Sequence, residues 1–105
     1  MVNLTEYVID TNNMYEPMEL LINKEVLYKN KVYQVSYNSV QDAEFIELSM
    51  GVYRYIGKTI KIRKMTRMMN AADQKVCAAA WRVDVPANQV YVIERGDVIT
   101  KEQYS

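Results

Sequence analysis

One stretch of the sequence gathers the side chains best suited to binding chemistry. Between Gly51 and Met68 there are several basic residues and no acid, and two tyrosines, Tyr53 and Tyr55, precede most of the bases. Proteins bind single-stranded nucleic acid by stacking bases on aromatic rings while cations neutralise the phosphates. Tyrosine and arginine also dominate the hot spots of protein interfaces. The composition of this stretch therefore suits binding of a macromolecule, and a solvated hairpin whose tyrosines cover the edges of the core explains it as well.

The same stretch has the pattern of two strands, over 52–56 and 59–65, separated by a Gly-Lys pair that suits a hairpin turn. Ile60 and Ile62 occupy alternate positions, so the cations between and after them face the opposite side. Alternation in the first strand is expected to put its two tyrosines beside these cations and Arg54 on the apolar side. The predicted partner-binding residues are Tyr53, Tyr55, Lys58, Lys61, Arg63, Lys64 and Arg67.

The sequence lacks the residues of the common catalytic and metal sites. It has no histidine, so no imidazole base is available, and one cysteine, Cys77, cannot supply a zinc site of the usual kind. The three glycines form no phosphate-binding motif. Asp42 and Glu44 would share one face of a strand and could hold a hard cation weakly, but a solvated edge explains them as well. We expect no catalytic residues, no metal and no cofactor, and hence no enzyme.

Thirteen basic and thirteen acidic residues give zero net charge, which provides no general attraction to nucleic acid or to an anionic membrane. We therefore expect a non-catalytic module that binds another protein, as an adaptor or as an inhibitor that occludes a macromolecular partner. Single-stranded nucleic acid is the alternative partner. No apolar run approaches the ~20 residues of a membrane span, and no signal peptide is visible. These observations predict a cytoplasmic protein without a membrane partner.

Charge is distributed unevenly along the chain. Residues 1–23 contain four acids and no base, whereas the stretch described above contains six bases and no acid. The acidic segment of one copy could contact the basic stretch of another, giving a head-to-tail assembly. A structural subunit of a homo-oligomer is therefore a third functional hypothesis.

The elements that must position these residues are predicted to be mainly strands. The 105 residues suit a single domain, with a short helix over 16–22 in the acidic segment 1–23 and a β-rich core over 24–100. About seven short strands with frequent turns predict a small antiparallel barrel or sandwich, with an SH3-like barrel as the first choice. One strand is expected over 98–100, followed by a frayed tail. Alternation over 77–85 favours a strand there, and the alternative is an α+β fold with a helix around 66–81.

Overall fold

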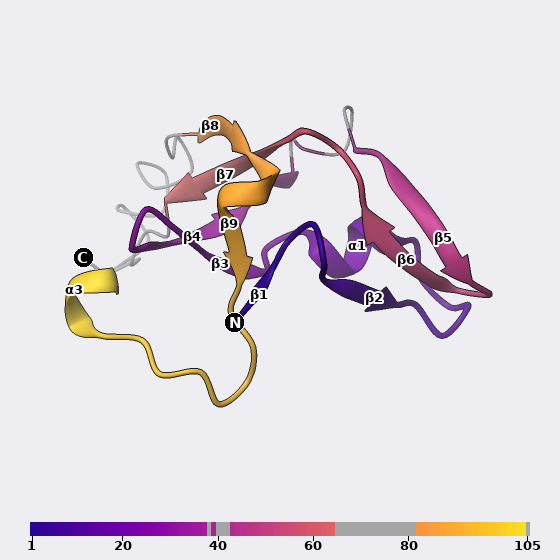
Figure 1. Cartoon of the computed structure of the whole chain (residues 1–105), viewed down its shortest axis with the longest axis horizontal. Helices are drawn as coiled ribbons and strands as arrows, with labels where there is room; N and C mark the ends of the chain where they lie inside the picture. The colour runs from indigo at the N-terminus through magenta and orange to yellow at the C-terminus, as the bar shows by residue number, and fades with distance from the viewer. Residues whose placement is uncertain (38, 40–42, 65–81, 105) are drawn as a thin grey trace, which may run out of the picture.

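The computed structural model describes residues 1–37, 39, 43–64 and 82–104, and these residues form a mainly β structure with two antiparallel sheets (Figure 1). The six-stranded sheet has the order β1 (Val2–Asn3), β9 (Val90–Val92), β3 (Glu25–Tyr28), β4 (Lys31–Val35), β7 (Thr59–Lys64), β8 (Arg82–Pro86). The three-stranded sheet has the order β2 (Val8–Asp10), β6 (Val52–Tyr55), β5 (Phe45–Ser49). The helices are α1 (Pro17–Leu21), η2 (Ala87–Gln89) and α3 (Lys101–Tyr104).

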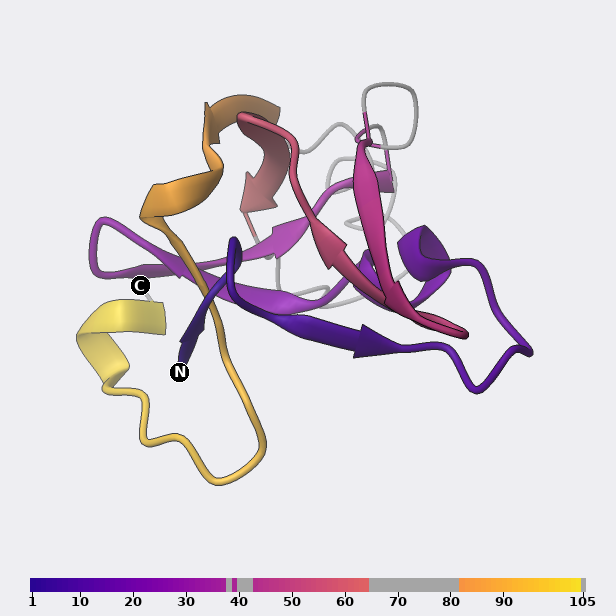
Figure 2. The ribbon, with the colours of Figure 1, turned by 45° about the vertical axis from the view of Figure 1, so that its right-hand side comes forward.

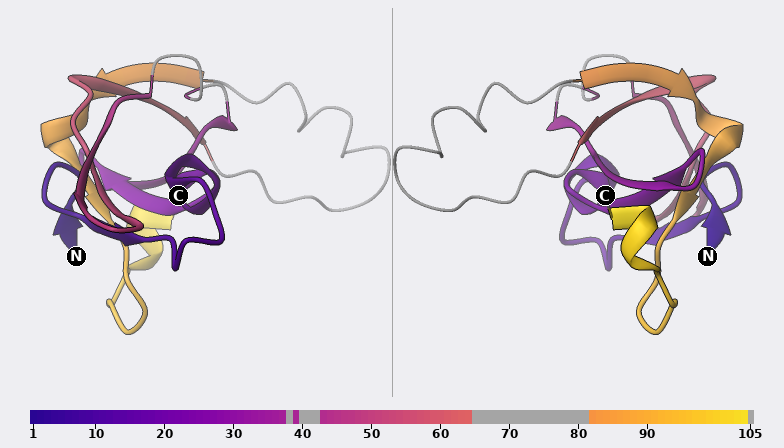
Figure 3. Two further views of the ribbon diagram at one scale, coloured as in Figure 1. Left: turned by 90° about the vertical axis from the view of Figure 1, so that its right-hand side faces the viewer. Right: turned by 90° about the vertical axis from the view of Figure 1, so that its left-hand side faces the viewer.

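The two sheets curve around a shared interior, as two further directions of view make plain (Figures 2 and 3). They are not closed into a barrel, because among the described strands none of one sheet pairs with a strand of the other. Both sheets contribute to one core, in which buried side chains include Ile9 and Tyr55 from the small sheet and Val26, Ile62 and Val92 from the large one. The predicted mainly β class is confirmed. In the described part of the chain, no helix is both long and apolar enough to cross a membrane.

Two local predictions are confirmed: the helix over 16–22, and a hairpin at Lys29-Asn30-Lys31, which the alternating residues on either side and an asparagine suited to a left-handed turn predict. Strands β3 and β4 form a hairpin around Lys29 and Asn30, whose φ angles of 48° and 65° are those of the two-residue turn that matches the strand twist. Helix α1 forms within the predicted range and begins with Pro17, where the missing N–H is no loss. The Glu16 N–H donates to Oε1 of Glu19 at 3.1 Å, which satisfies one free donor at the helix start.

The predicted hairpin around the Gly57-Lys58 pair is wrong. Strand β6 pairs with β2 and β5, whereas β7 pairs with β4 and β8, so the Gly-Lys pair carries the chain from one sheet to the other. The partner of β6 in its hairpin is β5, and the turn between them contains Gly51 at φ +75°. That left-handed conformation is the one for which glycine is suited, and it marks the true turn.

The ends of the chain also differ from expectation. Strands β1 and β2 lie in the segment expected to hold only a helix, and residues 98–100 form no strand. The tail expected to fray contains helix α3, where Lys31 donates through Nζ to the carbonyl of Glu102 at 2.7 Å. Of the strand predicted over 77–85, only the end is described, as part of β8, and the alternative helix around 66–81 lies outside the described residues.

Gly57 is required by close packing rather than by a turn. A Cβ atom added there would lie 2.5 Å from the hydroxyl of Tyr55, which is buried and donates to the carbonyl of Thr59 at 2.6 Å. We expect Gly57→Ala to lower the free energy of unfolding by about 1–3 kcal/mol, because the fixed ring cannot move away. Urea denaturation measures this, with Lys58→Ala as the control at the neighbouring exposed position. Equal stability of the two variants would contradict the prediction.

Candidate functional site

The outward side of the three-stranded sheet carries exposed apolar side chains. Val8, Arg54 and Ile46 are direct cross-strand neighbours on β2, β6 and β5, so they share one face. The Ile56 N–H donates to the carbonyl of Glu44 at 2.9 Å, which continues the β5–β6 pairing and puts Ile56 on the same side as Arg54. Val8, Ile46 and Ile56 are 54%, 43% and 48% exposed. We call these four residues the apolar face.

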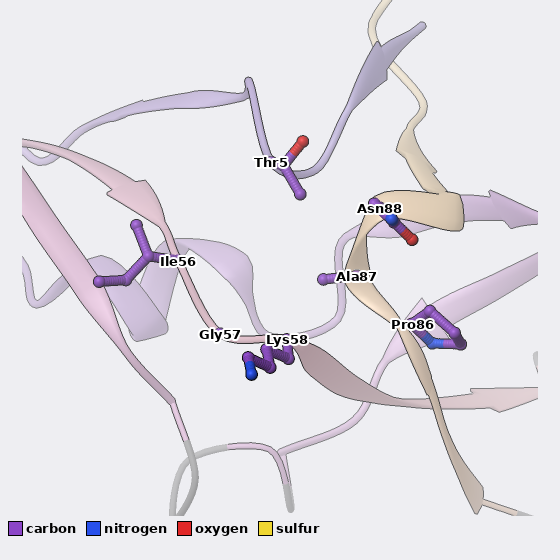
Figure 4. A pocket seen from close by; sticks show the side chains of 7 residues that line it. All are labelled: Thr5, Ile56, Gly57, Lys58, Pro86, Ala87 and Asn88. Carbon is purple, nitrogen blue, oxygen red and sulfur yellow. The ribbon is translucent and has the colours of Figure 1, made fainter.

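A pocket of about 410 Å³ adjoins the apolar face at Ile56. Three segments build it, namely the loop after β1, the link between β6 and β7, and the junction of β8 with η2 (Figure 4). The lining residues are Thr5, Ile56, Gly57, Lys58, Pro86, Ala87 and Asn88. The walls are tied together by hydrogen bonds, since Ala87 N–H donates to the carbonyl of Lys58 at 2.9 Å and Asn3 Nδ2 donates to that of Asn88 at 2.7 Å.

The lining of this pocket combines apolar and polar groups. Ile56, Pro86 and Ala87 give it apolar walls, while Lys58 adds an ammonium group and Asn88 an amide. Pockets that recognise ligands combine a mainly apolar lining with a few polar groups that fix orientation. An apolar side chain with a carboxylate or carbonyl nearby would match this lining.

The structure puts Tyr55 in the core, so it is not accessible at the surface, as its place among the predicted partner-binding residues requires. Its side chain is 1% exposed and its ring packs edge-on against Phe45 at 5.3 Å. The predicted alternation of β6 is correct, because the two tyrosines share one side and Arg54 lies on the other. The side assignment is reversed: the tyrosine side faces the core, and the side expected to be buried is the apolar face.

Tyr53 lies on the core-facing side of β6, opposite Ile9 on β2 and Glu47 on β5. It is partly buried, and its hydroxyl bonds to Glu47. This hydrogen bond to a carboxylate raises the pKa of Tyr53 above its ordinary value. Tyr53 is therefore engaged within its own sheet rather than beside the predicted cations.

The predicted cations are divided among three places. Lys61 and Arg63 lie on the outer face of the six-stranded sheet, and Nζ of Lys61 is 3.4 Å from Oδ2 of Asp84. Lys64 faces the other side, with Nζ 5.2 Å from the ring centre of Tyr33. Lys58 lines the pocket, and Arg67 lies outside the described residues. The expected shared face of tyrosines and cations is wrong, because β6 and β7 belong to different sheets.

Arg63 has an unusual environment. Its Nη2 donates to Oδ1 of Asn23 at 2.7 Å, but its Nε is buried without an acceptor. A buried donor without an acceptor costs about 1–3 kcal/mol relative to a satisfied one. Its cross-strand neighbour on β8 is a second arginine, Arg82, whose guanidinium lies 5.9 Å from the ring centre of Tyr37. Sequence reasoning did not identify Arg82 or Tyr37, because the register of β7 with β8 had not been assigned.

Neither the apolar face nor the pocket was predicted as a site. One signal in the sequence pointed to the apolar face. Arg54 interrupts the side of β6 that was expected to be apolar, and an arginine there indicates that this side is exposed. Within the described residues there is no group of three or more Cys, Asp and Glu side chains that could hold a metal ion. Asp42 lies outside those residues, so the weak cation pair with Glu44 has no described geometry.

Comparisons of the chain with protein-family models, with curated proteins and with solved structures give no match.

Proposed function

We propose that this chain is a non-catalytic module that binds another protein, as an adaptor or as an inhibitor that occludes its partner. The binding surface in this proposal is the apolar face together with the adjoining pocket. One observation carries it: Val8, Ile46 and Ile56 are about half exposed on one side of a sheet whose other side packs in the core. Clusters of exposed apolar side chains on a soluble domain commonly mark interaction sites.

The residues around this surface fit a protein partner. Arg54 lies at the centre of the apolar face, and arginine is enriched at interface hot spots because its long side chain offers both packing and hydrogen bonds. Lys58 and Asn88 supply polar groups at the pocket. A partner that presents an aliphatic or aromatic side chain next to a carboxylate would satisfy both parts of the surface.

Nucleic acid is a weaker candidate partner. Binding of single strands needs rings and cations on one face, but Tyr55 is buried and three of the predicted cations, Lys61, Arg63 and Lys64, lie on the other sheet. We also propose an SH3-like barrel or sandwich arrangement of the two sheets, and a cytoplasmic location. A homo-oligomer is a further hypothesis for the form in which the module acts.

Capture of partners from an extract of the native host, with the whole chain immobilised, tests the proposal. We expect a stoichiometric protein partner that binds at least roughly 30-fold more weakly to Ile46→Glu and to Ile56→Glu, since loss of a hot-spot contact removes about 2 kcal/mol or more. Val98→Glu is the matched control, because Val98 is 86% exposed and lies outside the apolar face. Circular dichroism checks that each variant is folded.

Two results would overturn the proposal. The first is a partner retained equally by the two face variants and by the control. The second is capture of nucleic acid alone, with an affinity that falls as salt rises, as phosphate contacts require.

A further inference from the structure

Two arginines stand side by side on the outer face of the six-stranded sheet. Arg63 on β7 and Arg82 on β8 are direct register partners, and the buried Ile60 and Ile62 alternate with the β7 cations, so both arginines point outward. Like charges directly opposite each other on a sheet repel. Such a pair is expected to attract a counter-charge.

No carboxylate in the described part of the chain supplies that counter-charge. Asp84 lies two residues along β8, but it pairs with Lys61 at 3.4 Å. Glu25 lies on the same face of the sheet but two strands away, because its register partner Gln34 is in turn the register partner of Arg63. It makes no ion pair among the described residues. Within residues 1–37, 39, 43–64 and 82–104, the two guanidiniums therefore form a patch of positive charge that has no ion-pair partner.

Among the described residues, these arginines have few hydrogen-bond partners. Arg63 donates through Nη2 to Oδ1 of Asn23, and its Nε is buried without an acceptor. Arg82 is exposed, and the described interaction of its guanidinium is with the ring of Tyr37. Since Tyr37 follows β4 and Arg82 lies on β8, this contact crosses the outer face of β7, which lies between those strands. The ring and the two guanidiniums thus gather over one part of the sheet.

We propose that Arg63 and Arg82 bind one oxyanion of the phosphate class. Guanidinium groups present planar pairs of N–H donors that match the oxygens of phosphate, and charge-assisted bonds of this kind are the strongest hydrogen bonds in proteins. The ligand accepts from the exposed Arg82 and from the terminal nitrogens of the half-buried Arg63, and the ring of Tyr37 forms one wall. This site lies on a different sheet from the apolar face and does not depend on the proposed protein-binding function.

Nuclear magnetic resonance tests the proposal through the Nε–H signals of arginine in the ¹⁵N-labelled chain. Inorganic phosphate is titrated while sodium chloride keeps the ionic strength constant. We expect the Arg63 and Arg82 signals to shift along one saturating curve. Arg82→Gln is expected to weaken phosphate binding about tenfold or more, because a charged hydrogen-bond partner is lost. Arg82 is exposed, so this variant is expected to stay folded.

A parallel titration with O-phosphoserine distinguishes a free ion from a phosphoryl group carried by a larger molecule. Tighter binding of O-phosphoserine identifies an attached phosphoryl group, and equal or tighter binding of inorganic phosphate identifies a free ion. Arg95→Gln is the control, since Arg95 is an exposed cation in the loop after β9 and should bind like the wild type. Linear shifts that chloride reproduces, or unchanged binding by Arg82→Gln, would overturn the proposal.

Discussion

Tyr55→Ala is expected to lower the free energy of unfolding by about 3–5 kcal/mol, as for other large aromatic side chains removed from a core. The ring is 1% exposed, packs against Phe45 and fills the space beside Gly57. Its loss leaves a cavity where the two sheets meet. A domain of this size is stable by about 5–15 kcal/mol, so this single change removes a large part of the total.

Tyr55→Phe separates the contribution of the hydroxyl from that of the ring. The hydroxyl donates to the carbonyl of Thr59 at 2.6 Å, and its removal is expected to cost about 1 kcal/mol. Urea denaturation followed by circular dichroism measures both variants. If Tyr55 instead bound a partner from the surface, Tyr55→Ala would leave stability nearly unchanged, and that result would refute the core assignment.

Leu4→Ala is expected to lower the free energy of unfolding by about 2–5 kcal/mol. Leu4 is fully buried. Its N–H donates to the carbonyl of Val90 at 2.8 Å, and this bond joins the segment after β1 to β9, a strand that is distant in the sequence. The substitution keeps this backbone bond and removes only the buried side chain. The expected loss therefore reports the packing of the segment between β1 and β2.

Val8→Ala is the matched control for Leu4→Ala, because it shortens an aliphatic side chain in the same segment at a position that is 54% exposed. We expect Val8→Ala to change stability by no more than about 0.5 kcal/mol. Thermal and urea unfolding measure both variants. Equal effects from the two would mean that the N-terminal segment packs only loosely on the sheets.

The elements that sequence reasoning predicted well are those decided by neighbouring residues. The β3–β4 hairpin depends on a turn at Lys29 and Asn30, and α1 depends on Pro17 and the acids around it. Strands β1 and β2 have two and three residues, too few for a hydrophobic period to be recognised. Their existence depends on pairing with β9 and β6, which are distant in the sequence.

The candidate site was harder to predict, for a reason visible at β6. Alternation establishes which residues share a side, and it correctly separated Tyr55 from Arg54. It does not establish which side faces the core, because tyrosine, valine and isoleucine all suit buried strands. The pairing of Arg63 with Arg82 likewise depends on the register between two strands separated by a long segment, and no local pattern encodes it.

The position of β9 has a consequence for how the chain folds during synthesis. Val92 on β9 is a register partner of both Val2 on β1 and Val26 on β3, so β9 lies between two strands made much earlier. Ribosomes add about 5–20 residues per second, and sheets built from distant segments form slowly. Until β9 leaves the ribosome, the facing edges of β1 and β3 lack their partner, so the large sheet cannot be completed before β9 has emerged.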